Sequence, residues 1–380
     1  MRATQAEVSL TALKHNFELI KSCIKKETKI CIPVKADAYG HGAVKIAQEV
    51  LSLGADYLAV AAVSEGIELR QAGITAPILL LSLPNFNECD DVIDFDITPL
   101  IFDYEMIDVF NELAEKKEKI CSVHLKVNTG MGRIGCSAED ALGLAQYIDI
   151  AKNLRLGGIC THFSVTDSLD PVDVAYSKEQ IATFSKVVDS IRKAGIDTGI
   201  VHAANSGAVL LYPESQFDMI RPGTIVYGYS PNTEIAGLLQ EMGKLKASFI
   251  PLMEVKTRVS AIISHKAGEA ISYGRTWVCD DDTDIAVLPI GYGDGILRNF
   301  APGLKVLINN KEFPVVGRIC MDQCMVNLGK NHGIKRWDEV TVIGNGIKCN
   351  SAEDIAKHTH TIWYEIITNI NKRVKRVYIN

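Results

Sequence analysis

A lysine followed by a tyrosine and a glycine-rich segment is the first part of this sequence that could do chemistry. Lys35 follows the apolar, β-branched run from Ile30 to Val34, and the segment V-K-A-D-A-Y-G-H-G-A continues to Ala43. A lysine at the end of a strand, beside a turn that could bind phosphate, suits a Schiff base to a phosphorylated aldehyde cofactor. The alternative is an ordinary exposed lysine, which this segment alone favours.

Polar residues also lie at or just after the ends of four later apolar runs, in this order: Lys126, Asn128 and Arg133; His162; His202, Asn205 and Ser206; Arg221, Gly223 and Thr224. In a parallel barrel the C-terminal ends of the strands share one mouth, so such residues would lie together. Ser206 and the backbone N–H groups of Gly223 and Thr224 could bind a phosphate. Arg133 could bind a carboxylate or a phenolic oxygen through its planar guanidinium. Each alone also has a structural explanation, such as a surface charge at Arg221.

The elements that would position these residues are eight short, largely apolar runs, which are typical of buried parallel strands. They are Ile30–Val34, Tyr57–Val63, Ile78–Leu83, Ile97–Ile101, Val123–Val127, Leu156–Phe163, Ile200–Ala204 and Phe217–Ile220. Most are separated by amphipathic helical patterns, and eight such units in about 235 residues match a (β/α)₈ TIM-like barrel. A doubly wound open sheet is the alternative, but it would not need eight similar units.

Past residue 240 the pattern changes to short strand-like runs separated by turn residues, which indicates a β-rich domain. The runs are Val255–Ile263, Ile285–Pro289, Lys305–Ile308, Phe313–Val316, Met325–Leu328 and Val340–Ile343. We expect one helical insert among them, at Ser351–His358. The prediction is therefore an α/β protein with a barrel at residues 1–240 and a mainly-β C-terminal domain at residues 241–380.

The bulk properties narrow the functional class. A net charge of -6 over 380 residues does not indicate binding to nucleic acid or to an anionic membrane surface. No apolar run approaches the roughly 20 residues of a membrane span, and no signal peptide is apparent. The ten cysteines are scattered through apolar stretches, which favours reduced thiols and a cytoplasmic location. Cys320 and Cys324 lack a second pair of ligands, so we expect no metal site.

Several segments closely resemble the bacterial alanine racemase family. In the first domain they are V-K-A-D-A-Y-G-H-G, N-T-G-M-G-R-I-G, H-A-A-N-S-G and R-P-G-T-I-V-Y-G. In the second they are I-S-Y-G-R-T-W, G-Y-G-D-G, G-R-I-C-M-D-Q and W-Y-E-I-I-T. The resemblance covers both domains in the expected order. It implies an isomerase that uses pyridoxal 5′-phosphate to interconvert L- and D-alanine, supplying D-alanine for peptidoglycan.

The resemblance also implies a pair of catalytic residues. Lys35 matches the lysine that carries the cofactor and acts as one base, and Tyr273 matches the opposing base, which the second subunit delivers in this family. Racemisation removes a proton from one face of the substrate and returns it on the other, which two opposed groups can do. A homodimer with active sites shared between subunits is therefore expected.

The remaining site residues are carried over in the same way. Those matching the cofactor site, besides Lys35, are Tyr39, His162, Ser206, Arg221, Gly223, Thr224 and Tyr364. Arg221 matches the partner of the pyridine nitrogen, and because arginine stays protonated it must donate that hydrogen bond. Arg133 and Met321 match substrate-binding positions. Supporting positions are matched by His202 behind Arg221, by Asp322, and by Tyr292 and Arg298 at the entrance.

Four positions depart from the family pattern or leave a question open. Asn128 stands where many relatives carry aspartate, Thr224 replaces a more usual isoleucine, and Trp363 is bulkier than expected. Lys126 matches a lysine that some relatives carbamylate. The competing functions are a broader or serine racemase, a related pyridoxal-phosphate decarboxylase, and a non-enzymatic cofactor-binding module. The arginine at 221 speaks against a decarboxylase, and Tyr273 in a second domain speaks against the binding module.

Overall fold

The computed structural model describes residues 3–301, 303–346 and 349–380. The chain divides into two compact units. The barrel unit comprises Leu13–Ala38 and Ala43–Ile250, and the β unit comprises Met1–Ala12, Tyr39–Gly42 and Pro251–Asn380. The β unit thus includes the N-terminal strand and the four residues Tyr39–Gly42, which interrupt the barrel unit in sequence. Our predicted boundary between residues 240 and 241 stays a prediction.

The barrel unit contains a closed, eight-stranded parallel barrel in the order β2 to β9, as the sequence predicts. Its strands are β2 (Lys29–Pro33), β3 (Tyr57–Val60), β4 (Ile78–Leu80), β5 (Ile97–Ile101), β6 (Cys121–Lys126), β7 (Leu154–Cys160), β8 (Ile200–His202) and β9 (Met219–Ile220). Pairing of β9 with β2 closes the barrel. The apolar runs are buried because their inward side chains pack against each other, for example Cys31, Ala59, Leu79 and Met219.

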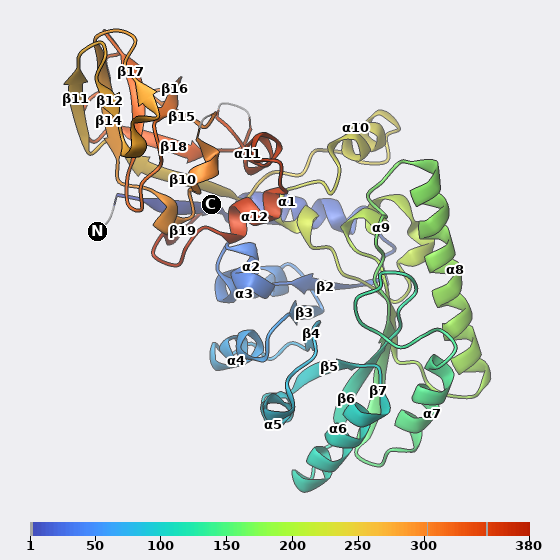
Figure 1. The fold of residues 1–380 in the computed structure, drawn as a ribbon. Coiled ribbons are helices and arrows are strands. Elements are labelled where there is room, and N and C mark those ends of the chain that lie inside the picture. Colours follow the sequence, from blue (N-terminus) through green and yellow to red (C-terminus); the bar gives the residue numbers. More distant parts are fainter. Residues whose placement is uncertain (1–2, 302, 347–348) are drawn as a thin grey trace. The chain divides into compact units, whose positions relative to one another are not determined.

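Helices connect most of these strands and lie outside them (Figure 1). They are α1 (Leu10–Lys21), α3 (Ala43–Ser52), α4 (Val63–Gln71), α5 (Cys89–Asp94), α6 (Tyr104–Lys116), α7 (Ala141–Ile150), α8 (Pro171–Lys193), α9 (Ser206–Leu211) and α10 (Thr233–Glu241). The longest, α8, begins where the side chain of Asp170 accepts a hydrogen bond from the backbone N–H of Val172. Among the described residues no helix is long and apolar enough to cross a membrane.

The β unit is built on a nine-stranded sheet in the order β11-β14-β17-β16-β15-β18-β10-β1-β19. Its strands are β1 (Gln5–Ser9), β10 (Met253–Arg258), β11 (Ala261–His265), β14 (Thr283–Leu288), β15 (Lys305–Ile308), β16 (Lys311–Val316), β17 (Cys324–Gly329), β18 (Glu339–Ile343) and β19 (Lys375–Ile379). A small hairpin of β12 (Ala270–Ile271) and β13 (Trp277–Val278) forms a separate two-stranded sheet. The β-rich C-terminal domain is therefore confirmed.

Two local predictions for this unit are wrong. The run Val255–Ile263 forms two strands, β10 and β11, because the chain leaves one pairing partner, β18, and joins another, β14. The helical insert is not single either. Besides α11 (Ala352–Thr359), the segment W-Y-E-I-I-T forms α12 (Trp363–Thr368), whose aromatic and β-branched residues do not favour a helix by themselves. Burial of Trp363, Ile366 and Ile367 overrides that preference.

Candidate active site

Lys35 follows β2 at the start of a strained turn. The four residues after it, Ala36 to Tyr39, have φ values of 51°, 54°, 53° and 52°, which is the left-handed region for non-glycine residues. Each such residue costs about 1–2 kcal/mol, so the turn must be held by contacts. One is local, since the N–H of Ala38 donates to the carbonyl of Val34 at 2.8 Å.

The second contact comes from Glu65 on α4, a residue that the sequence analysis did not select. One carboxylate oxygen accepts from the N–H of Ala36 at 2.6 Å. The other accepts from the N–H groups of Ala61 and Ala62 at 2.8 and 3.1 Å. Glu65 therefore connects the turn after Lys35 to the end of the neighbouring strand. Its only sequence signal is a glutamate at the third position of a helix, where capping is the usual explanation.

The amine of Lys35 is partly buried, which makes its protonation less favourable than in water. Burial lowers the pKa of Lys35 from its ordinary value, and the positive charge of Arg133 lowers it further. The charge of Glu65 acts in the opposite sense. A lysine amine with a lowered pKa is more readily unprotonated near neutrality, which is the form that attacks an aldehyde or accepts a proton.

The loop that carries Arg133 is shaped by Asn128. Its side-chain oxygen accepts hydrogen bonds from the backbone N–H groups of Gly130 and Gly132, at 3.1 and 3.0 Å. An aspartate oxygen could accept both bonds, so the asparagine preserves this role. Arg133 itself is exposed, as a residue that meets a ligand would be.

Arg221, after β9, is a buried cation at the barrel mouth. One terminal nitrogen bonds Nδ1 of His202 at 2.6 Å, and the other donates to the carbonyls of Thr161 at 2.7 Å and Ala203 at 3.1 Å. Nδ1 of His162 lies 3.4 Å from the same nitrogen. The structure thus brings together three residues from the ends of separate strands, and His202 is hydrogen-bonded to the guanidinium. The supporting role of His202 stays a prediction.

Burial, together with the charge of Arg221, keeps the neighbouring histidines neutral. Burial, followed by the charge of Arg221, holds the pKa values of His162 and His202 well below the ordinary value. Burial is also the main cause that lowers the pKa of Lys126 to about 8. The mouth therefore presents a permanent positive charge with neutral imidazoles beside it, a setting that favours an anionic ligand.

Ser206, Gly223 and Thr224 form a second cluster of the barrel unit. The hydroxyl oxygen of Ser206 accepts from the N–H of Gly223 at 2.9 Å, which joins the start of α9 to the loop after β9. The hydroxyl of Thr224 is buried, and it finds no hydrogen-bond partner among the described residues. A buried hydroxyl without a partner is costly unless a ligand supplies one. These residues fit a phosphate group.

The predicted phosphate residues Tyr39 and Tyr364 belong to the β unit. Their ring centroids are 5.9 Å apart. Burial raises the pKa of Tyr39 to about 12, so its hydroxyl stays protonated and can donate a hydrogen bond. The Trp363 ring stacks on Tyr364 with centroids 3.9 Å apart and limits the positions that this tyrosine can take.

The β unit carries its own pocket, of about 590 Å³, lined by Ser272, Tyr273, Cys320, Met321, Asp322, Gln323 and Met325. Within the single chain 71% of Tyr273 and 53% of Met321 are exposed. Arg373, which the sequence analysis missed, donates to Asp322 at 2.9 Å and to the fully buried Asp294 at 2.7 Å. The predicted substrate-side residues Tyr273, Met321 and Asp322 therefore lie together.

The two predicted entrance residues lie on the β unit surface but are not part of the lining of this pocket. Tyr292 and Arg298 are exposed, on two short 3₁₀ turns, and neither lines the pocket of Tyr273. The backbone N–H of Tyr292 donates to the carbonyl of Cys320 at 3.0 Å, which places it beside that pocket's wall.

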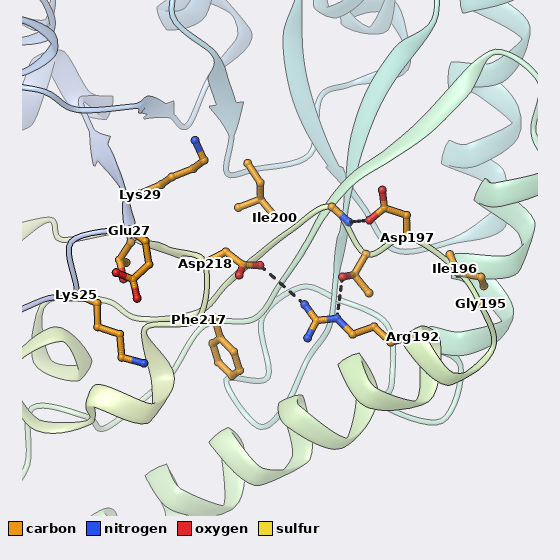
Figure 2. Close-up of a pocket in the computed structure, with 13 residues that line it drawn as sticks. Lys25, Glu27, Lys29, Arg192, Gly195, Ile196, Asp197, Ile200, Phe217 and Asp218 are labelled. Atoms are coloured by element: carbon orange, nitrogen blue, oxygen red, sulfur yellow. Dashed lines mark hydrogen bonds and ion pairs between the residues drawn. The ribbon is translucent and has the colours of Figure 1, made fainter.

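A larger pocket, of about 900 Å³, lies at the opposite, N-terminal end of the barrel strands. Figure 2 shows Arg192 reaching from α8 toward Asp218, 4.0 Å away, with its Nε donating to Thr198. Lys29 on the same wall pairs with Asp56 at 3.7 Å. The positive and negative side chains of this pocket are therefore paired with each other. Active sites of barrel enzymes lie at the C-terminal ends of the strands, so this pocket is not the candidate site.

The fold and the site together define a barrel enzyme whose lysine, arginine and histidines converge at the C-terminal ends of the strands. The family model for the alanine racemase N-terminal domain matches residues 8–231, and the model for the C-terminal domain matches residues 252–378. The chain belongs to the alanine racemase family, whose members are isomerases.

Individual relatives agree with this assignment. The alanine racemase of Treponema denticola is 48% identical over all of this chain and 99% of its own length, and that of Treponema pallidum is 43% identical over all of both chains. The solved alanine racemase of Clostridium difficile is 37% identical with a TM-score of 0.93, over 100% of this chain and 96% of its own. That of Bartonella henselae, solved with covalently bound pyridoxal phosphate, is 27% identical with a TM-score of 0.85 over the whole of both chains.

Proposed function

We propose that this protein interconverts L- and D-alanine with pyridoxal 5′-phosphate as its cofactor, and supplies D-alanine for peptidoglycan in the cytoplasm. The observation that carries the proposal is the full-length similarity to alanine racemases combined with the convergence of Lys35, Arg221 and His202 at the barrel mouth. A broader or serine racemase shares this geometry and is separated by the substrate test below. A decarboxylase is not favoured by the relatives.

The residues of the barrel unit fit the cofactor. Lys35 supplies an amine with a lowered pKa for the aldehyde carbon. The bonds of Arg221 to His202, Thr161 and Ala203 use three of its five N–H groups, so further donors remain for a ring nitrogen. Thr224, Ser206 and Gly223 would bind the phosphate, and His162 would pack beside the ring. The family resemblance adds Tyr39 and Tyr364, which belong to the β unit, as further phosphate ligands. When bound, the cofactor withdraws electrons from the substrate and makes its α-proton acidic.

The chain's own residues would then move the proton. Lys35 and Tyr273 act as the two bases, one for each face of the substrate, and Arg133 holds the carboxylate while Met321 limits the side chain. Asp322, fixed by Arg373, supports the loop of Met321. Because Arg221 can only donate a hydrogen bond, it would face an unprotonated ring nitrogen, and this would limit electron withdrawal and therefore side reactions.

The exposure of Tyr273 supports a homodimer in which each active site uses residues from both subunits. A base that is 71% exposed in its own chain cannot work in a water-excluded site unless something covers it. Mixing a Lys35→Ala protein with a Tyr273→Ala protein should restore one intact site per heterodimer. Demonstrated subunit exchange without any return of activity would refute the shared site.

The substrate test is the loss of optical rotation of L-alanine, L-serine and L-lysine, with and without added pyridoxal phosphate. We expect L-alanine to lose rotation fastest, and only with cofactor. Faster loss with serine or lysine would favour the alternative racemases. No change with any of the three would remove the racemase proposal.

A further inference from the structure

A row of three buried side chains runs from Arg221 into the barrel interior. Arg221 bonds Nδ1 of His202 at 2.6 Å, and Nε2 of His202 lies 2.8 Å from Nδ1 of His124 on β6. The exposed fractions of Arg221, His202 and His124 are 6%, 0% and 2%. Arg221 and His202 belong to the proposed site, whereas His124 has no role in it so far.

The chemistry of arginine fixes the direction of every bond in this row. A guanidinium only donates, so Nδ1 of His202 must be the acceptor and carries no proton. Burial and the charge of Arg221 keep both histidines neutral, since the pKa of His124 is lowered to about 3 and that of His202 well below its ordinary value. A neutral imidazole has one N–H, so His202 carries it on Nε2 and donates to His124. His124 then accepts on Nδ1 and carries its own proton on Nε2.

The barrel makes room for His124 on the adjacent strand. The register between β6 and β7 shifts between Val123 and His124. A Cβ on Gly158 would lie 2.6 Å from the His124 ring, and one on Gly157 would lie 3.4 Å from it. The Gly158 contact is closer than real packing allows, so the missing side chain at Gly158 leaves space both for the imidazole and for the backbone carbonyl of Ile200. The Gly157 contact with the ring is an ordinary one, and a Cβ there would first meet the side chain of Ser122.

We propose, building on the proposed function, that His124 is a positioning residue that fixes the tautomer of His202 and thereby holds Arg221 in place. His124 acts as an acceptor at a point where His202 must present an N–H. Without that acceptor, the N–H of His202 is buried without a partner, or it moves to Nδ1 and confronts the donors of Arg221. His124 Nε2 faces away from this row, and the ring lines a smaller pocket with Ser122 and Arg155 at the N-terminal end of the barrel.

The test uses two replacements that differ in one property. His124→Asn can place its side-chain oxygen where Nδ1 was and keeps an acceptor, whereas His124→Leu has similar bulk and no acceptor. We expect kcat for alanine to fall about 10-fold to 100-fold in the leucine variant and to stay within about threefold of wild type in the asparagine variant, with little change in KM. Equal losses in the two variants would overturn the inference.

The tautomer is measured directly by ¹⁵N NMR of histidine-labelled, cofactor-loaded protein, with the His202 signals assigned by their absence in a His202→Gln protein. Wild type and His124→Asn should show His202 protonated on Nε2, and His124→Leu should not. Ser215→Ala, which removes a different buried hydrogen bond of the barrel unit, should leave the His202 signals unchanged. A wild-type His202 protonated on Nδ1 refutes the inference even if no variant folds.

The two proposals can fail separately. The tautomer of His202 does not depend on turnover, so a protein that shows the predicted spectrum but leaves alanine unchanged would refute the proposed function only. The inference is then judged by the contrast between the asparagine and leucine spectra.

Discussion

Replacing Glu65 tests how the strained turn after Lys35 is held. Three backbone N–H groups donate to its carboxylate, and at this partly buried position about 1 kcal/mol for each bond gives a loss of about 3 kcal/mol for Glu65→Ala. Glu65→Gln is the more specific test, because it removes one hydrogen-bond acceptor and keeps the size of the side chain. Its single oxygen can serve Ala61 and Ala62, which leaves an NH₂ group against the N–H of Ala36, so we expect a loss of about 1–2 kcal/mol concentrated at the turn.

The same replacements should change the amine of Lys35. Because the charge of Glu65 raises the pKa of Lys35, both variants should lower it further. The assays are urea unfolding, for the free energy of unfolding, and the pH dependence of Lys35 acylation in cofactor-free protein, read from the mass of the Lys35 peptide. We expect the midpoint of acylation to move to lower pH.

The matched control is Glu68→Ala, an exposed glutamate on the same helix. It should change the free energy of unfolding by less than about 0.5 kcal/mol and leave the acylation midpoint unchanged. If Glu65→Ala behaves like Glu68→Ala in both assays, the turn is held by something other than this carboxylate, and our explanation of the position of Lys35 is refuted.

Thr224, Arg221 and Lys126 at the barrel mouth can each be tested by a single replacement. Thr224→Val should stabilise the cofactor-free protein by about 1 kcal/mol in urea unfolding and weaken pyridoxal phosphate binding, because it removes a buried hydroxyl without a partner; unchanged affinity would exclude Thr224 from the phosphate site. Arg221→Glu should increase transamination, in which the amino group of alanine passes to the cofactor and pyruvate is released; a flat pyruvate yield contradicts the role of Arg221. Burial lowers the pKa of Lys126 to about 8 in the folded protein. Between about pH 8 and pH 10 the unfolded chain therefore binds more protons than the folded one, so the free energy of unfolding should contain a component that rises with pH. This component should be missing in Lys126→Met. The absence of that difference would indicate a lysine that is charged when folded, or one whose amine is carbamylated.

The barrel strands could be predicted because each is an almost continuous apolar run, and a strand buried on both faces needs that composition. The positions of Lys35, His202 and Arg221 follow from the same pattern, since Lys35 and Arg221 come directly after such runs and His202 is the last residue of a strand. The left-handed turn at Ala36–Tyr39 could not be predicted, because no residue type there demands a positive φ. Distant contacts, including that of Glu65, hold it.

Other features depend on pairing that a local pattern does not encode. The strand β1 is only five residues long, and its partners β10 and β19 are more than two hundred residues away. Glu65, His124 and Arg373 do not themselves stand at the mouth of a site. They act on residues that do, through backbone or side-chain hydrogen bonds, so neither spacing nor motif reveals them.

The central claim is that Lys35 and Tyr273 each move the α-proton on one face of alanine. The most direct measurement is the uptake of deuterium at the α-carbon of L- and D-alanine in deuterium oxide, by wild type and by Tyr273→Phe. Wild type should label both enantiomers and interconvert them. Tyr273→Phe should label one enantiomer through Lys35 without interconversion. Labelling of both enantiomers by the variant would contradict the two-base account.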